Sequence, residues 1–307
     1  MAKISIIMTT YNGEAFIIPQ LESLKNQTRT PDEVLIFDDQ SKDDTPKLIQ
    51  NFISENNLSW SLVINAEQQG WRKNFMQGFQ KARGDIIFPC DQDDIWNYHK
   101  IEDMAKILEE RPEINLLVSN YSILYDSSYN RKRIQSKFIN DKAVVRLGVL
   151  EVKNISRPGC VYSFRSDFLE KIQPFWEEDF AHDAWVWRCA VLEQSAYLYR
   201  YSLIEFRRHQ SNSSPHFKRN REAKLLRYEK NERVFVKIYD YCNTYNKQDF
   251  SIHYARQFGQ FYHARREYLQ SYQLRNVVTM IRYIRFYRTF KEFLGDLLLR
   301  FSIFEKK

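Results

Sequence analysis

Short runs rich in β-branched residues alternate with helical stretches along the first part of the chain. This alternation is typical of βαβ units, in which helices join parallel strands. We therefore predict an α/β fold with a mostly parallel central sheet flanked by helices. Strands are expected at residues 4–9, 33–37, 60–64, 85–89 and 114–119, and helices at residues 14–26, 46–56, 72–82 and 97–110.

The composition is that of a globular protein. Of the 307 residues, 43% are hydrophobic, and 22 Phe, 19 Tyr and 6 Trp supply enough apolar surface for a large core. No stretch approaches the roughly 18 apolar residues of a spanning helix, and the first apolar run is too short for a signal peptide. The cysteines form no C-x-x-C pair, so a disulfide framework or zinc site is disfavoured and a reducing, cytoplasmic setting is expected.

The charge divides the chain into two parts. Residues 216–307 hold 20 Lys and Arg against 9 Asp and Glu, a net of +11, whereas residues 1–215 hold 26 against 30, a net of −4. The run at 211–215 has the composition of a linker. We predict an α/β body over residues 1–215 and a basic, aromatic-rich helical region over residues 216–307, with helices at 221–241, 251–271 and 274–304.

Carboxylates gather where the predicted strands end. Asp38 and Asp39 follow the second strand, and Asp91, Asp93 and Asp94 follow the fourth. In open α/β sheets, ligands bind beyond the carboxyl ends of the strands. Asp38 and Asp39 alone would be explained equally well as caps of the next helix. Five acidic residues at one edge repel one another, and a hard divalent cation with oxygen ligands would compensate them.

The motifs around these carboxylates resemble those of inverting glycosyltransferases of family 2, which have the nucleotide-diphospho-sugar GT-A fold. The matching motifs are S-I-I-M-T-T-Y-N-G at 5–13, F-D-D-Q-S at 37–41, Gly70 with Asn74, G-D at 84–85 and D-Q-D-D at 91–94. A narrower resemblance, through D-Q-D-D-I-W with Lys100 and F-R-R-H at 206–209, is to the rhamnosyltransferase-like branch that builds bacterial surface polysaccharides.

The resemblance implies a set of residues that bind the donor. Thr9 and Tyr11 would line the nucleobase pocket, and Asp39 would accept a hydrogen bond from a pyrimidine imide. Arg72 and Lys73 open a predicted helix whose N-terminus favours a diphosphate, although solvated surface charge is the alternative. The full set expected to bind the nucleotide sugar is Thr9, Tyr11, Asp39, Arg72, Lys73, Asp91 and Gln92.

The same resemblance implies a divalent cation, Mn²⁺ or Mg²⁺, and a catalytic base. Asp91, Asp93 and His209 are the expected metal ligands. Asp94 is expected either as a further ligand or as the cap of the next helix. Asp183 is the expected base for the acceptor hydroxyl, and a plain helix cap is its alternative role.

A further group of residues is expected around the acceptor and the transferred sugar. It consists of Trp96, Gly159, Cys160, His182 and Arg207. By resemblance, Gly159 and Cys160 match a strand that borders the sugar pocket, and Arg207 would assist with leaving-group charge. The sequence has no Q-x-x-R-W motif, the signature of processive members, so we expect one sugar to be added per binding event.

The implied function is metal-dependent transfer of one sugar, with inversion, from dTDP-rhamnose or a UDP-hexose. The acceptor would be a hydroxyl of a growing, lipid-linked bacterial surface polysaccharide. A glycoside hydrolase also uses paired carboxylates, but the second acidic pair, Asp38 and Asp39, argues against it. A nucleic-acid-binding protein would fit the pI of about 9.0, but the acidic body argues against that class.

Two roles are open for the basic C-terminal region. In the first, the region contacts the inner face of the plasma membrane peripherally and so brings the active site to a lipid-linked acceptor. Alternatively, it packs against the body or against a second subunit in a homodimer.

Overall fold

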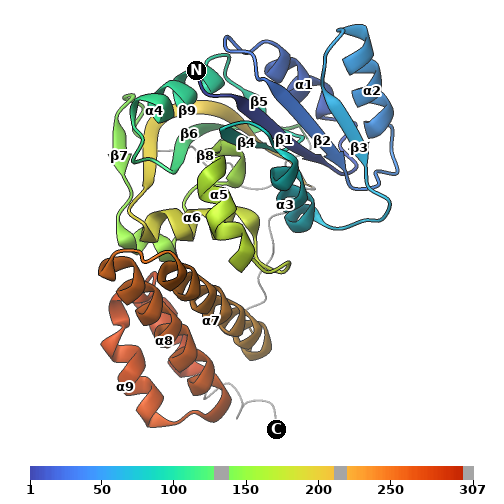
Figure 1. The fold of residues 1–307 in the computed structure, drawn as a ribbon. Coiled ribbons are helices and arrows are strands. Elements are labelled where there is room, and N and C mark those ends of the chain that lie inside the picture. The colour runs from blue at the N-terminus through green and yellow to red at the C-terminus, as the bar shows by residue number, and fades with distance from the viewer. Residues whose placement is uncertain (128–137, 211–219, 300–307) are drawn as a thin grey trace.

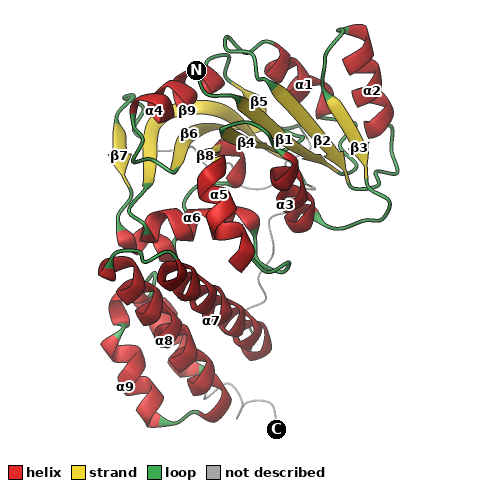
Figure 2. Cartoon of the chain, viewed as in Figure 1, coloured by secondary structure: helices red, strands yellow, loops and turns green. Residues whose placement is uncertain are grey.

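The computed structural model describes residues 1–127, 138–210 and 220–299 (Figure 1). An α/β body carries the strands, and a group of helices follows it (Figure 2). The strands are β1 (Ile4–Thr10), β2 (Glu33–Asp38), β3 (Ser61–Ile64), β4 (Ile86–Cys90), β5 (Ile95–Trp96), β6 (Leu116–Tyr125), β7 (Val144–Arg146), β8 (Tyr162–Arg165) and β9 (Ala196–Arg208). The helices of the body are α1 (Ile17–Lys25), α2 (Thr45–Glu55), α3 (Trp71–Lys81), α4 (Lys100–Glu110), α5 (Ser166–Ile172) and α6 (His182–Leu192). The later helices are α7 (Arg221–Thr244), α8 (Asp249–Ser271), α9 (Leu274–Arg282) and α10 (Phe290–Leu298). Short 3₁₀ turns are η1 (Val149–Lys153), η2 (Gly159–Val161), η3 (Gln173–Phe175) and η4 (Ile284–Phe286).

The described strands form one sheet in the order β3-β2-β1-β4-β8-β6-β9-β5, with β7 paired to β9. The β1–β2, β1–β4, β2–β3 and β6–β9 pairs are parallel, and the β4–β8, β6–β8, β5–β9 and β7–β9 pairs are antiparallel. The predicted α/β class with a mostly parallel central sheet is confirmed, and the antiparallel pairs are short additions to it. The antiparallel pairs involve β5, β7 and β8, which are 2, 3 and 4 residues long and too short to give a periodic signal in the sequence.

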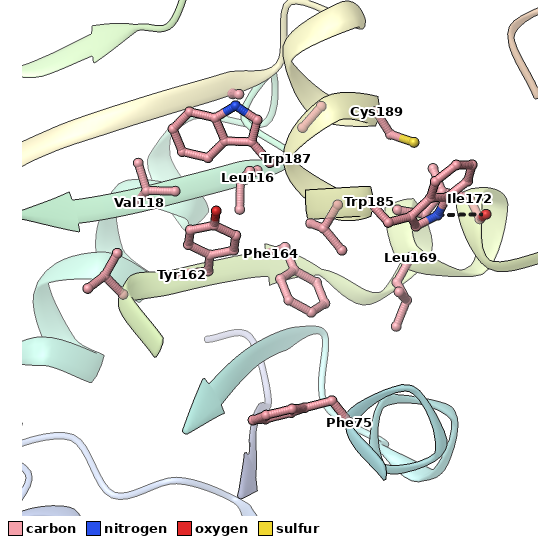
Figure 3. Packing of buried hydrophobic residues seen from close by; sticks show 14 of the residues in the cluster. Phe75, Leu116, Val118, Tyr162, Phe164, Leu169, Ile172, Trp185, Trp187 and Cys189 are labelled. Atoms are coloured by element: carbon pink, nitrogen blue, oxygen red, sulfur yellow. Dashed lines mark hydrogen bonds between the residues drawn. The ribbon is translucent and has the colours of Figure 1, made fainter. Parts of the chain in front are cut away.

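Helices cover both faces of the sheet, with α1, α2 and α4 on one face and α3, α5 and α6 on the other (Figure 1). The central strand β1 is buried along nearly its whole length, as expected for a strand that is covered on both faces. On the second face, Trp185 and Trp187 of α6 are buried in the core, with the Trp187 ring 5.9 Å from that of Tyr162 of β8 and Trp185 beside Ile172 of α5 (Figure 3). Trp185 also donates from its indole nitrogen to the Ile172 carbonyl, at 3.1 Å.

The C-terminal helices begin with α7 and α8, which lie side by side (Figure 1). The single helix predicted at residues 274–304 is instead interrupted: α9 ends at Arg282, η4 follows, and α10 starts after Thr289. Thr289 caps α10 by accepting from the backbone nitrogen of Glu292, a local signal that stops the preceding segment from continuing. Residues 300–304, like the predicted linker at 211–215, lie outside the described residues.

The C-terminal helices contact the body through charged side chains. Arg233 of α7 bonds Glu177 and Asp179, both at 2.6 Å, and Lys247 bonds Glu193 at 3.0 Å. Packing of the helices against the body, one of the expected alternatives, is therefore observed. Within the described ranges, no helix has both the length and the apolar character to cross a membrane.

Candidate active site

The carboxyl ends of β2, β1 and β4 lie at one edge of the sheet. The three strands are parallel neighbours, with Thr10 of β1 in register with Asp38 of β2 and Met8 in register with Cys90 of β4. The acidic segments that follow β2 and β4 therefore start on either side of the end of β1. This arrangement brings the sequence motifs to one edge, where α/β sheets bind ligands.

Asp38 supports the loop after β2. Its buried carboxylate accepts from the Thr10 hydroxyl at 2.7 Å and from the backbone nitrogen and hydroxyl of Ser41, at 2.8 and 2.6 Å. These bonds hold the ends of β1 and β2 together.

Asp39 joins the end of β2 to the loop before α3. Its carboxylate accepts from the backbone nitrogens of Gln69 at 2.7 Å and Gly70 at 2.8 Å, and from the Asn65 side chain at 3.0 Å. Asp39 therefore fixes the loop before α3 to the end of β2. The same residue is the one expected to contact the nucleobase. That contact between Asp39 and an imide stays a prediction.

Tyr11 and Gln92 are linked across the site. The Gln92 amide accepts from the Tyr11 backbone nitrogen at 2.8 Å and donates to the Tyr11 carbonyl at 3.0 Å. A Cβ on Gly13 would lie 2.3 Å from the Gln92 side-chain oxygen, so a larger residue there would displace the Gln92 side chain from this position. Gln92 thus positions the loop that presents the Tyr11 ring, which is 42% exposed, while Thr9 is half-buried in β1.

Arg72 and Lys73 lie in the first turn of α3, as expected. The Arg72 guanidinium lies 4.5 Å from the centre of the Trp71 ring, and Lys73 forms an exposed ion pair with Glu178 at 3.1 Å. A diphosphate would have to displace or share these partners, so their role in donor binding stays a prediction.

Asp91 and Asp94 lie beside the Cys160 thiol. One ligand atom from each of these residues falls within 4.8 Å of the other two. Asp94 is fully buried and accepts from the backbone nitrogen of Arg207 at 3.0 Å. It does not cap α4, because the residue before that helix is His99.

Burial and mutual repulsion both disfavour the charged forms of carboxylates in the acidic cluster. Burial raises the pKa of Asp91 well above its usual range, and the charges of Asp94, Asp93 and Asp183 raise it further. Burial and the neighbouring Asp93 also raise the pKa of Asp94 to about 7. Converging carboxylates with raised pKa values are what a divalent cation would compensate, so the residues present fit the expected Mn²⁺ or Mg²⁺.

The expected metal ligands Asp93 and His209 are in direct contact. His209 Nε2 lies 2.7 Å from Asp93 Oδ2, and the buried imidazole packs against the Phe16 ring with centroids 4.4 Å apart. Cys160 fits a hard cation less well, because burial raises the pKa of its thiol and thiols are soft ligands. The chemistry of the thiol therefore disfavours Cys160 as a ligand, and the assignment of Asp91, Asp93 and His209 to the cation stays a prediction.

Lys100 lies beneath the acidic cluster, a position to which the sequence analysis assigned no role. Its side chain is fully buried, with the ammonium 4.3 Å from the centre of the Trp96 ring and 5.1 Å from that of Phe88. Burial lowers the pKa of Lys100 to about 8, and nearby Cys160, Cys90 and Asp94 oppose this shift. The only signal in the sequence was that Lys100 follows the D-Q-D-D-I-W motif by four residues.

Trp96 is a core residue. Only 2% of it is exposed, because β5 holds the indole against Phe88 and Lys100. The expectation that Trp96 offers a face to a sugar ring is therefore wrong for this structure. A two-residue strand gave no indication in the sequence of which side it would bury.

Asp183 lies in the first turn of α6, facing Gly159. Its Oδ1 accepts from the backbone nitrogen of Ala184 at 2.7 Å, which is a cap-like contact. A Cβ on Gly159 would lie 3.0 Å from the Asp183 Cβ, so the missing side chain permits this close approach. Because its charge raises the pKa of Asp91, Asp183 is within electrostatic reach of the acidic cluster.

Gly159 and Cys160 lie in the turn η2, not in the strand that was expected there. Pro158 precedes the turn and cannot donate a ladder hydrogen bond, so the strand β8 starts only at Tyr162. Both residues still border the acidic cluster.

His182 is buried among aromatic rings and does not face an acceptor. Its ring lies 4.2 Å from Phe75, 5.4 Å from Trp71 and 5.6 Å from Phe79, measured between centroids. Burial lowers the pKa of His182 to about 4, so the imidazole is neutral near pH 7. The predicted acceptor contact of His182 is replaced by a packing role that depends on tertiary neighbours.

Arg207 connects the end of β9 to the acidic segment. Its Nε donates to the Asp93 carbonyl at 2.8 Å, and its guanidinium lies 5.4 Å from the Phe16 ring centre. The cation is therefore held beside the expected metal ligands, where it was predicted to act on leaving-group charge.

Comparison with solved structures identifies the fold. The first 349 residues of *Staphylococcus aureus* TarS with UDP-GlcNAc match with a TM-score of 0.62 and 20% identity, over 91% of this chain and 79% of that chain. The same region with UDP matches with a TM-score of 0.60 and 19% identity, over 86% and 71%. The chain has the GT-A fold of the nucleotide-diphospho-sugar transferases.

The chain belongs to glycosyl transferase family 2, whose family model matches residues 5–173. Putative glycosyltransferase EpsH of *Bacillus subtilis* is 30% identical over 125 residues, 41% of this chain and 35% of EpsH. The poly(ribitol-phosphate) β-N-acetylglucosaminyltransferase TarS of *Staphylococcus aureus* is 32% identical over 121 residues, 38% of this chain and 21% of TarS. The matches thus span only about a third or less of these relatives.

Proposed function

We propose that the protein transfers one sugar, with inversion, from a nucleotide diphosphate to a saccharide hydroxyl. The observation that carries this proposal is the convergence of Asp91, Asp93, Asp94 and Asp183 at one sheet edge, with His209 bonded to Asp93. A divalent cation held by Asp91, Asp93 and His209 would neutralise the diphosphate as it leaves.

The residues around that cluster take separate parts in the proposed reaction. The acceptor oxygen attacks the anomeric carbon while the bond from that carbon to the diphosphate breaks. Asp183 takes the hydroxyl proton, since it lies within electrostatic reach of Asp91 yet on a different element. Arg207 adds positive charge beside the departing diphosphate.

A UDP-hexose is the first donor that we propose, because the matching TarS structures contain UDP and UDP-GlcNAc. dTDP-rhamnose is the second, from the sequence motifs at 91–96 and 206–209. A uracil or thymine imide would donate to Asp39, and the exposed Tyr11 ring would stack on the base. The proposed acceptor is a lipid-linked surface polysaccharide, reached from the cytoplasm.

A thermal-shift panel tests the proposal. The ligands are UDP, dTDP, GDP and CMP, each with Mn²⁺, with Mg²⁺ and with EDTA. A nucleotide at 100 times its Kd stabilises the folded state by about 2.7 kcal/mol. We expect a shift with UDP or dTDP that disappears in EDTA. If none of the four nucleotides raises the unfolding temperature, the proposal is contradicted and a hydrolase or a binding protein is favoured.

A further inference from the structure

Two groups of basic residues on the C-terminal helices differ in their partners. On α7, the side chains of Lys230, Arg233 and Lys237 pair with Glu177 or Asp179 of the body, at 2.6 to 3.7 Å. These cations are compensated within the molecule. They therefore attach the helices to the body and leave little charge for a partner.

The second group lies on the last helices. Residues 274–298 hold five cations, all exposed: Arg275, Arg282, Arg285, Arg288 and Lys291. Within the described part of the chain, none of them forms an ion pair. The side-chain hydrogen bonds of Arg285 and Arg288 go to the neutral groups Gln257 Oε1 and the Lys153 carbonyl, which leave the charge in place.

The two carboxylates of the same segment point the other way. Asp296 is fully buried and bonds Arg265 at 2.8 Å and Lys224 at 2.9 Å. Glu292 also pairs with Arg265, at 2.8 Å. The exposed side of residues 274–298, here called the α9–α10 surface, therefore presents cations without exposed anions.

Apolar side chains accompany these cations. On α9, Leu274, Val278 and Ile281 are 73%, 69% and 52% exposed, at spacings of four and three residues that place them along one stripe of the helix. On α10, Phe290 and Leu298 are each 61% exposed, with Leu294 between them at 40%.

The cores of these helices are filled by other residues. Met280, Phe286 and Phe293 form the buried side of the segment. The exposed stripes are therefore not needed to hold α9 and α10 in place, and their contact with water is unfavourable. A partner that accepts both apolar side chains and cations would remove that cost.

We propose that the α9–α10 surface docks on an anionic lipid bilayer. Apolar stripes bordered by Arg and Lys are the pattern of interfacial helices, which combine partial burial with attraction to anionic headgroups. A second copy of this chain is the weaker candidate, because a two-fold contact would oppose the same uncompensated cations. The inference does not depend on the proposed reaction.

Vesicle co-sedimentation of the full chain tests the docking surface. Vesicles of phosphatidylcholine alone are compared with vesicles containing about one third phosphatidylglycerol, at low and high salt. We expect binding only to the anionic vesicles, weakened by salt. Failure of the full chain to bind anionic vesicles at low salt would overturn the proposal.

Two double variants localise the contact. Val278→Ser with Ile281→Ser removes apolar contacts, and Arg275→Gln with Arg282→Gln removes two charges. Each double variant should weaken vesicle binding about tenfold or more. In the charge variant, each of the two lost interfacial cations accounts for about a fivefold factor. Circular dichroism checks that the variants are folded.

Matched controls carry similar changes elsewhere. Val236→Ser on α7 and Lys106→Gln on α4 alter exposed side chains away from the α9–α10 surface and should bind as the unchanged protein does. Equal binding by the double variants and the unchanged protein would refute the docking surface. A dimer seen by light scattering, lost in the Val278→Ser, Ile281→Ser variant without any vesicle binding, would instead assign the surface to a second copy.

Discussion

His209 Nε2 lies 2.7 Å from Asp93 Oδ2, although the two residues are 116 positions apart in the sequence. Asp93 follows β4 in the first half of the body, and His209 directly follows β9 at its end. The contact joins the last described residues of the body to its acidic cluster.

Replacing His209 should weaken binding of the divalent cation. We expect His209→Ala to lower Mn²⁺ affinity about tenfold or more, because one side of the Asp93 carboxylate loses its partner. Calorimetric titration with Mn²⁺ measures the change. The control is His99→Ala, which removes an exposed imidazole bonded to Glu102. Unchanged Mn²⁺ affinity in His209→Ala would exclude His209 from the metal site.

Asp183→Asn separates catalysis from donor binding. The amide oxygen can still accept from the Ala184 nitrogen, so the start of α6 is preserved, but the proton acceptor is lost. We expect kcat to fall by about 10²–10⁴ while UDP affinity is unchanged. Asp167→Asn is the matched control, an exposed carboxylate in the first turn of α5. A kcat within twofold of the unchanged enzyme would remove Asp183 as the base.

Gly159→Ala tests the close approach of η2 to Asp183. The added methyl would lie 3.0 Å from the Asp183 Cβ, which is closer than ordinary contact, so Asp183 must shift. A displacement of this kind should reduce kcat by about an order of magnitude or more. The control Gly148→Ala has no atom within 4 Å of the new Cβ and an ordinary φ of −76°. Its activity should be unchanged, and equal activity of both variants would show that the spacing is unimportant.

His182 should make the protein sensitive to acid. Its pKa is lowered to about 4 from 6.5, so the unfolded chain takes up the proton first as pH falls. Stability is therefore lost between pH 6.5 and 4, by up to about 3 kcal/mol from this group. In His182→Phe that part of the loss should vanish, as measured by urea unfolding at pH 7.5 and 4.5. The control His253→Phe, at an exposed position on α8, should retain it. An identical acid loss in His182→Phe and the unchanged protein would contradict this account.

Asp296 should be essential for the packing of the C-terminal helices. Its carboxylate accepts from Lys224 and Tyr228 of α7, from Arg265 of α8 and from Tyr287. Burial tends to raise its pKa, but Arg265 and Lys224 lower it below the usual value, so Asp296 is ionised at neutral pH.

Asp296→Ala would leave the Arg265 guanidinium buried with one carboxylate partner fewer, at a cost of about 3–5 kcal/mol. Urea unfolding followed by circular dichroism measures it. Asp240→Ala, at an exposed position on α7, should change stability by less than about 0.5 kcal/mol. A similarly small effect at Asp296 would contradict the role of this network.

The first half of the fold was predictable because its strands and helices are long enough to be periodic. Strands at 4–9, 33–37 and 85–89 coincide with β1, β2 and β4 to within one residue. The short strands β5, β7 and β8 were missed because so few residues cannot show alternation. The break between α9 and α10 depends on the cap at Thr289, which the prediction of one helix over residues 274–304 did not include.

The site was predictable where a motif follows a strand and less so where burial decides. Asp93 and His209, far apart in sequence, were expected at one site and lie in contact. Trp96 and His182 were expected at the acceptor, but both are buried by residues from other elements. Their surroundings form only when the sheet and helices pack, so local sequence could not reveal them.

The pairing of β9 limits which sequence changes this fold can accept. Ser119 of β6 pairs with Tyr199 and Asn120 with Ser202, so β9 already contains extra residues in an irregular stretch. A second irregularity separates Ser202 from Glu205, and from Glu205 onward the side chains alternate between faces up to Arg207. A substitution there changes one contact, whereas inserting or deleting one residue would turn Arg207 away from Asp93 and shift His209. We therefore expect the number of residues between Glu205 and His209 to be less variable among functional relatives than their identities.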